Sequence, residues 1–319
     1  MSASGGNKAI IAALLANLGI AATKLIAFAF SGASSLLAEG IHSIADSGNQ
    51  LLLLLGGRKA RQRADNKHPF GYGRERFVYA FVVSIVLFSV GGVFALYEGI
   101  HKLQNPEPLE YWWLPLAVLA IAIVLESLSL RTAIRESNPL RGDATWIQFI
   151  RHSKAPELLV LLLEDTAALL GLVMAFCGVG LTALTGNSVW DAAGTIGIGI
   201  LLVVVAIILG IETKSLLVGE GATLEDVQAI EAAIENGEFG EIIHLKTLYL
   251  GPDELLVGAK LAFPAEMRFS EVAAAIDRIE VRVRTAVPAA RVIYIEPDVA
   301  RIEQGASLNT DAVFIKGID

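Results

Sequence analysis

Long apolar runs alternate with short polar links over the first 212 residues of the chain. Each run is close to the roughly 20 residues that an α-helix needs to cross the hydrocarbon core of a bilayer. We therefore predict a transmembrane domain of six helices. These helices cover residues 9–31, 36–57, 77–101, 112–132, 157–183 and 188–211.

After residue 212 the pattern becomes that of a small soluble domain. The predicted elements are a helix over 224–236 with Thr223 as its cap, strands over 242–250 and 255–263, a helix over 271–286 and a strand over 290–295. This α-β-β-α-β order is that of an α+β fold with helices on one face of a sheet. The expected regions are a six-span transmembrane domain over 1–212, the α+β domain over 213–300 and a C-terminal tail over 301–319.

Charge then orients the predicted helices. Arg and Lys gather in the links after the second and fourth predicted spans, whereas Lys102 alone lies in the links on the opposite side. The positive-inside rule therefore predicts that both termini are cytoplasmic. Ten Lys and Arg residues and eighteen Asp and Glu residues follow position 212, so the soluble part carries the whole net charge of −8. Such an acidic domain excludes nucleic acid as an expected partner.

The second predicted span carries the clearest candidate chemistry, because His42 and Asp46 lie one helical turn apart within it. Residues at i and i+4 project from the same face of a helix. A carboxylate at membrane depth costs several kcal/mol unless it is paired or solvated. An imidazole nitrogen and a carboxylate oxygen make a suitable half-site for Zn²⁺ or a similar divalent ion. The alternative is a His–Asp pair that only satisfies itself between helices.

Glu164 and Asp165 lie in the middle of the fifth predicted span. Neighbouring residues on a helix point about 100° apart, so these two carboxylates are not expected to face the same ion. We expect one of them to face a shared centre with the second span and the other to meet a polar neighbour, a water-filled vestibule or a proton. Carboxylates offered by two helices to one centre are typical of metal sites in helical bundles.

Three further polar groups allow simpler interpretations. Lys24 in the first span either snorkels to the interface or pairs with an acid such as Glu39. Asp191 begins the sixth span and is expected to cap it. Asp65 and His68 follow the second span at a spacing that can bind a metal weakly, although an ordinary polar loop explains them as well.

Three stretches together resemble the cation diffusion facilitator family. They are AEGIHSIADSGNQ at 38–50, HPFGYGRERF at 68–77 and WDAAGTIGIGI at 190–200. The resemblance covers nearly the whole chain and is strongest to the branch that includes zinc transporter nine. It implies six spans with cytoplasmic termini, a ferredoxin-like C-terminal domain and a homodimer in the plasma or inner membrane. It also implies export of Zn²⁺ or another divalent ion in exchange for protons.

The resemblance assigns metal ligands as well. The family's pair on the second span corresponds to His42 and Asp46, and the Asp of its pair on the fifth span corresponds to Asp165. The His that usually stands four residues earlier is Leu161 here. Glu164, Asn49 or water could supply the missing ligand, and a site rich in oxygen would favour Mn²⁺ or Fe²⁺ over Zn²⁺. The family's second site survives in part as Asp65 and His68, with Tyr72 where some members have another His.

We therefore predict a divalent-cation efflux transporter that works by alternating access, with the ion bound between the second and fifth spans. The transported ion is expected to be Zn²⁺, with Mn²⁺, Fe²⁺ and Co²⁺ as alternatives, and no resident cofactor is expected. Protons are expected to compete with the ion for the same ligands. The alternatives are a membrane-embedded metalloenzyme and a metal-binding sensor or scaffold. We do not expect an enzyme, because the sequence contains no recognisable catalytic motif.

Overall fold

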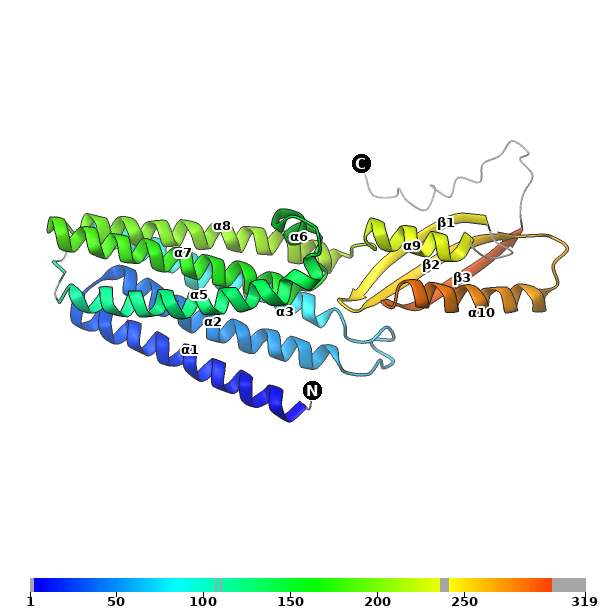
Figure 1. The fold of residues 1–319 in the computed structure, drawn as a ribbon, viewed down its shortest axis with the longest axis horizontal. Helices are drawn as coiled ribbons and strands as arrows, with labels where there is room; N and C mark the ends of the chain where they lie inside the picture. The colour runs from blue at the N-terminus through cyan, green and yellow to red at the C-terminus, as the bar shows by residue number, and fades with distance from the viewer. Residues whose placement is uncertain (1–2, 107, 110, 236–240, 300–319) are drawn as a thin grey trace, which may run out of the picture. The chain divides into compact units, whose positions relative to one another are not determined.

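A computed structural model describes residues 3–106, 108–109, 111–235 and 241–299 (Figure 1). The chain forms two compact units: the first runs to Glu220 and also includes Leu250–Pro252, and the second comprises the other residues from Gly221 onward. The last membrane helix therefore continues past residue 212 before the second unit begins. The tail expected over 301–319 lies outside the described residues.

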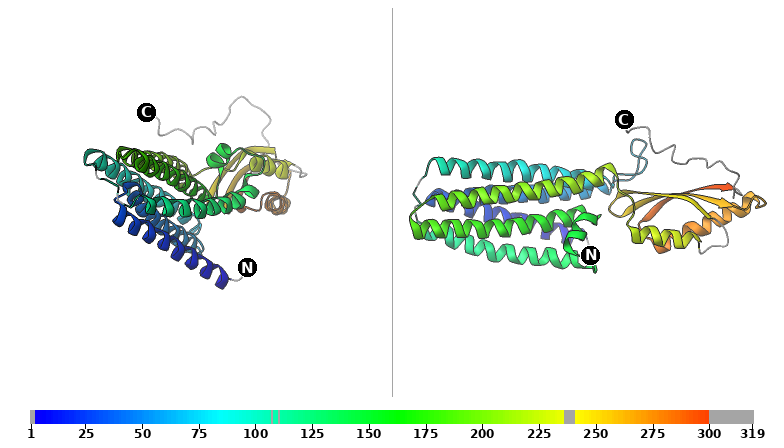
Figure 2. Two further views of the ribbon diagram at one scale, coloured as in Figure 1. Left: turned by 60° about the vertical axis from the view of Figure 1, so that its left-hand side comes forward. Right: turned by 90° about the horizontal axis from the view of Figure 1, so that it is seen from above.

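The first unit is a bundle of long helices that lie side by side (Figures 1 and 2). Its helices are α1 (Ala3–Ser31), α2 (Ser34–Ala60), α5 (Trp113–Arg141), α7 (Pro156–Thr185), α8 (Val189–Val218) and a composite rod of α3 (Glu75–Val86), the π-helix η1 (Leu87–Val93) and α4 (Phe94–Gln104). The short helix α6 (Trp146–His152) links α5 to α7. Each predicted span thus corresponds to one long helical rod, and the predicted fold class is confirmed.

Four of these rods are long and apolar enough by themselves to cross a membrane: the composite rod over Glu75–Gln104, α5, α7 and α8. Helix α1 contributes a shorter apolar stretch, Asn17–Ser31, among the residues searched. Helix α2 does not meet the criterion, because acidic and polar residues such as Glu39, Asp46 and Asn49 interrupt its apolar run. The least apolar of the long helices in the bundle is therefore the one that carries His42, Asp46 and Asn49.

Glycines let the helices of the bundle approach closely. A methyl group added at Gly199 of α8 would lie 2.7 Å from the backbone nitrogen of Leu96 in α4. One added at Gly194 would lie 3.1 Å from the carbonyl oxygen of Met174 in α7. Small residues at such contacts are typical of helix packing in membranes. Large apolar side chains on the outside, such as Ile121 and Leu128 of α5, are exposed, as expected for surfaces that face lipid.

The second unit has the predicted α-β-β-α-β order. Its elements are α9 (Leu224–Glu235), β1 (Glu241–Gly251), β2 (Glu254–Phe263), α10 (Phe269–Ala286) and β3 (Ala290–Val299), with the strands in the order β1-β2-β3. Strands β2 and β3 are parallel, and α10 connects them. Thr223 caps α9 as predicted, because its hydroxyl accepts a hydrogen bond from the Asp226 N–H at 3.1 Å.

One apolar core joins the two helices of this unit to its sheet. Ile230 and Ile234 of α9 and Ile279 of α10 are buried against strand residues such as Leu261 and Ile293. Leu224, at the start of α9, is instead exposed. Both helices therefore cover the same face of the sheet, as the sequence pattern predicted (Figure 2).

Candidate metal centre

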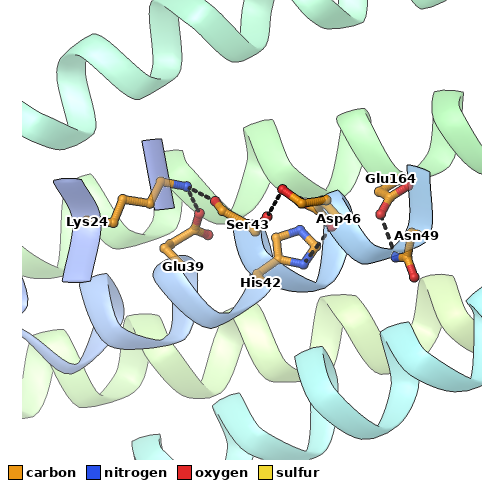
Figure 3. Close-up of polar contacts among 8 residues, drawn as sticks. Lys24, Glu39, His42, Ser43, Asp46, Asn49 and Glu164 are labelled. Carbon is orange, nitrogen blue, oxygen red and sulfur yellow. Dashed lines mark hydrogen bonds and ion pairs between the residues drawn. The ribbon is translucent and has the colours of Figure 1, made fainter. Parts of the chain in front are cut away.

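Helix α2 turns a stripe of polar residues toward the inside of the bundle. Glu39, His42, Asp46 and Asn49 lie three or four residues apart, so they share one face of the helix (Figure 3). Glu39, His42 and Asn49 are buried, and the Asp46 side chain is 18% exposed. The opposite face carries exposed apolar residues, including Ile44 and Leu51. We call Glu39, His42, Asp46 and Asn49 the α2 stripe.

His42 and Asp46 lie together at the centre of the α2 stripe. The Nδ1 atom of His42 is 3.4 Å from the Oδ1 atom of Asp46. Within the described residues, the two ring nitrogens of His42 have no hydrogen-bond partner, and the Oδ1 atom of Asp46 has none either. A buried polar atom without a partner costs about 1–3 kcal/mol, so such atoms need an explanation. A neutral imidazole offers one ring nitrogen as an acceptor, so a nitrogen and a carboxylate oxygen that converge without hydrogen-bond donors are suited to a cation.

The two carboxylates of α7 face different neighbours, as their adjacent positions predicted. The Oε1 atom of Glu164 accepts a hydrogen bond of 2.7 Å from the Asn49 Nδ2 group of the α2 stripe. The Oδ2 atom of Asp165 accepts one of 2.9 Å from the Ser129 hydroxyl of α5. Glu164 is therefore the α7 carboxylate bound directly to the α2 stripe, whereas Asp165 contacts α5.

The candidate ligands are not gathered into one closed set. Across the described ranges, no three His, Cys, Asp or Glu side chains converge closely enough to hold a metal ion. Leu161 packs against an apolar cluster that contains Phe149 and Leu162, so its position belongs to a hydrophobic contact. The structure thus brings together His42 with Asp46, and Asn49 with Glu164, and the side chains of Asp46 and Glu164 link these two pairs between α2 and α7.

Lys24 of α1 forms a buried ion pair with the end of the α2 stripe. Its Nζ atom lies 3.0 Å from the Oε2 atom of Glu39 and donates a second hydrogen bond, of 2.9 Å, to the Ser43 hydroxyl (Figure 3). Both charged side chains are almost fully buried. Of the two interpretations of Lys24 that the sequence left open, the structure selects pairing with Glu39.

Asp191 caps α2 rather than its own helix, so the expectation that it caps the sixth span is wrong. Its carboxylate accepts hydrogen bonds from the backbone N–H groups and the hydroxyls of Ser34 and Ser35. The cap position of α8 is occupied by Ser188. A carboxylate at a helix N-terminus satisfies N–H groups that have no partner within the helix and complements the helix dipole. Asp191 therefore fixes the start of the helix that carries the candidate ligands.

The π-helical segment η1 lies beside His42, and no sequence pattern identified it. A methyl group added at Gly91 would lie 3.7 Å from the Nδ1 atom of His42. Single π-helical turns within α-helices are frequent at functional sites. The adjacent Gly91 and Gly92 inside an apolar run were the only signal in the sequence. A larger residue at position 91 would contact the imidazole directly.

The loop after α2 holds Asp65, His68 and Tyr72 at the surface. The Asp65 carboxylate accepts hydrogen bonds from the Tyr72 hydroxyl at 2.8 Å and from the backbone N–H groups of Lys67 and His68. The bond from Tyr72, followed by that from the His68 N–H, lowers the pKa of Asp65 below its usual range. His68 Nδ1 is 3.7 Å from the Asp65 Oδ1 atom. These contacts are those of a turn stabilised by its own Asp.

Comparison with known proteins gives one matching family model and three similar proteins. A family model described as the cation efflux transmembrane domain matches residues 10–218. The proton-coupled zinc antiporter SLC30A9, mitochondrial, of Mus musculus is 34% identical over 269 residues, which are 83% of this chain and 46% of that protein. Metal tolerance protein C4 of Arabidopsis thaliana is 27% identical over 82% of this chain and 58% of that protein. The cation-efflux pump FieF of Klebsiella pneumoniae is 28% identical over 70% of each chain.

These matches differ in how much of each protein they include. The family model extends through the helical bundle from within α1 to the end of α8. The chain spans about half the length of the SLC30A9 antiporters that it matches. The candidate centre lies entirely within the matched helices.

Proposed function

Because this chain belongs to the cation efflux, or cation diffusion facilitator, family, we propose that it carries a divalent metal cation across a membrane in exchange for protons. The mouse relative is named a proton-coupled zinc antiporter, which supports Zn²⁺ and protons as the transported species. The bundle of long apolar helices makes the chain an integral membrane protein.

One observation carries the proposal most directly. His42 and Asp46 converge inside the bundle, and in the described part of the chain neither the ring nitrogens of His42 nor the Oδ1 atom of Asp46 has a hydrogen-bond partner. A buried polar atom without a hydrogen-bond partner costs free energy, and an apolar pair or a fully hydrogen-bonded pair at these positions would avoid that cost. A transported cation explains why such atoms are retained, because it supplies the missing partner only while it is bound.

We assign the transport site to His42 and Asp46 of α2 together with the carboxylates of α7. Glu164 faces α2 directly, and Asp165 lies beside it on the side of α5. Asn49 holds Glu164 and could supply an amide oxygen. Because Leu161 replaces a nitrogen ligand, the site contains one imidazole and several oxygens, a set that also suits Mn²⁺, Fe²⁺ and Co²⁺. Asp65 and His68 are at most a weak surface site.

The proposed mechanism is alternating access between α2 and α7. The ion enters from the cytoplasmic side, displaces protons from His42 and the carboxylates, and leaves on the other side when the helices rearrange. Binding of the ion and of protons to the same ligands then couples their movements in opposite directions. Release requires that the site bind the ion only moderately tightly.

The proposal also includes the orientation, the oligomeric state and the membrane. The basic links support cytoplasmic termini, and the family resemblance supports a homodimer in the plasma or inner membrane. The proposed regions remain a transport domain, a ferredoxin-like domain and a tail. Because the mouse relative is named mitochondrial, fractionation of cells that express the chain should decide the membrane.

Transport in proteoliposomes tests the function. Purified protein should accumulate Zn²⁺ when a pH gradient is imposed and lose accumulation when the gradient is collapsed. Asp46→Ala should abolish uptake, while Asp143→Ala, at an exposed position in the link between α5 and α6, should leave it unchanged. Stoichiometric Zn²⁺ binding without uptake would favour a sensor or scaffold. Full uptake by Asp46→Ala would reject the assigned site.

A further inference from the structure

The ion pair of Lys24 and Glu39 is the one buried charge pair that joins α1 to the α2 stripe in the described residues. Lys24 is 3% exposed and Glu39 is fully buried. Removing two charges from water costs several kcal/mol each, and mutual attraction repays this cost only with good geometry. An apolar pair of similar volume would pack here at lower cost, so the pair calls for an explanation beyond stability.

Glu39 keeps one oxygen free, and that oxygen lies over α7. Its Oε2 atom binds Lys24, whereas its Oε1 atom is buried and has no hydrogen-bond partner among the described residues. A methyl group added at Gly171 would lie 2.6 Å from this Oε1 atom. The carboxylate therefore occupies the space between α2 and α7 that a side chain at position 171 would fill. These are the two helices that hold the proposed transport site.

The pair is also close enough to the transport site to act on it. Glu39 precedes His42 by three residues, so the two side chains project from the same face about one turn apart. The Lys24 ammonium interacts electrostatically with both His42 and Asp46. Glu126 of α5, a half-buried acid without an assigned role, interacts electrostatically with the same ammonium. Lys24 is thus a fixed positive charge beside a group of carboxylates.

We propose that Lys24 is a positioning residue that keeps Glu39 out of the coordination sphere of the transported cation and thereby keeps the site weak enough to release its ion. The proposal rests on the transport site assigned above. The ammonium holds the Glu39 carboxylate at the end of the stripe and repels a dication bound one turn away. Without that ammonium, Glu39 offers an additional oxygen ligand next to His42, and the bound ion is held too tightly.

Opposite effects of two single substitutions distinguish this role from a purely structural one. Lys24→Met frees the carboxylate, so the Kd for Zn²⁺ should fall at least about tenfold while the maximal rate of uptake falls as well. Glu39→Gln leaves the ammonium without its partner, so the Kd should rise at least about tenfold. Lys24→Met combined with Glu39→Gln should return the Kd to near the wild-type value, and Lys24→Arg should resemble the wild type.

The measurements are calorimetric titration of the full-length protein with Zn²⁺ and initial rates of uptake by proteoliposomes at varied Zn²⁺. Lys24→Met and Glu39→Gln proteins that elute as folded species and both bind Zn²⁺ more weakly would overturn the proposal. If Lys24→Met does not fold, the double variant must still bind Zn²⁺ more tightly than Glu39→Gln. Asp46→Ala is included throughout, because retention of wild-type Zn²⁺ binding by that variant rejects the transport site itself rather than the role of Lys24.

Discussion

The helical bundle and the C-terminal α+β domain bury different kinds of side chain. Every buried charged or polar residue in the described ranges lies in the bundle, including Lys24, Glu39, His42 and Asp191. The core of the α+β domain is built from apolar residues such as Ile230, Leu261 and Ile279. The domain thus follows the usual rule for a soluble core. In the bundle, buried charged and polar side chains are concentrated where α2 meets α1, α7 and α8.

The largest expected effects come from the α7 carboxylates. Glu164→Ala and Asp165→Ala should each reduce Zn²⁺ uptake by more than the roughly 10- to 100-fold that loss of an outer-shell partner of a metal site typically costs. Glu164 contacts the α2 stripe and Asp165 lies beside it, so both remove a candidate oxygen ligand. Uptake rates of proteoliposomes at equal protein content provide the measurement. Wild-type uptake rates in both variants would show that the buried carboxylates of α7 are not needed for transport.

Substitution of Asp191 should reduce the stability of the bundle more than it reduces Zn²⁺ binding. Asp191→Ala leaves the N–H groups and hydroxyls of Ser34 and Ser35 without their acceptor. Each orphaned buried donor costs about 1–3 kcal/mol, so the thermal midpoint of the bundle should fall clearly. Unfolding in detergent, followed by tryptophan fluorescence, measures this, with Asp143→Ala as the matched exposed control. An unchanged midpoint would show that the cap at α2 does not contribute to stability.

An apolar truncation in the C-terminal domain should lower the stability of that domain without changing Zn²⁺ binding. Leu261→Ala removes a fully buried side chain from β2 and should destabilise the domain by about 2–5 kcal/mol. Hydrogen exchange of the full-length protein should speed up in β2 and β3. The Kd for Zn²⁺ should stay at the wild-type value, because no proposed ligand lies in this domain. A large change in that Kd would show that the two regions are not separate in function.

The smallest effect concerns Tyr249 in the α+β domain. Burial, with the neighbouring Asp226 carboxylate, raises the pKa of Tyr249 to about 12. An unfolded Tyr ionises near pH 10, so the folded domain binds this proton more tightly and loses stability as pH rises from about 10 to 12. Ultraviolet titration should detect one late-ionising tyrosine fewer in Tyr249→Phe than in the wild-type protein. Identical titration curves for the two proteins would contradict this contribution.

Much of the architecture could be predicted from the sequence, because it follows from local pattern. The six spans and the α-β-β-α-β order arise from run length and periodicity, and His42 and Asp46 were identified by spacing on a single helix. The divergence of Glu164 and Asp165 also follows from helix geometry alone.

Long-range partners could not be predicted in the same way. Asp191 accepts hydrogen bonds from Ser34, 157 positions earlier in the chain, and nothing near Asp191 identifies that partner. The same holds for Ser129 beside Asp165, and for Gly171 under the Glu39 carboxylate. The sequence shows that a polar residue lies at membrane depth, but the packing of helices decides which group satisfies it.

The most direct test of the account is the coordination of the bound ion. X-ray absorption at the zinc edge, on full-length protein with one equivalent of Zn²⁺, should show one imidazole nitrogen among oxygen ligands and no sulfur. The imidazole contribution should disappear in His42→Ala and persist in His68→Ala. A spectrum without imidazole, or one that His42→Ala leaves unchanged, would contradict a transport site on the α2 stripe.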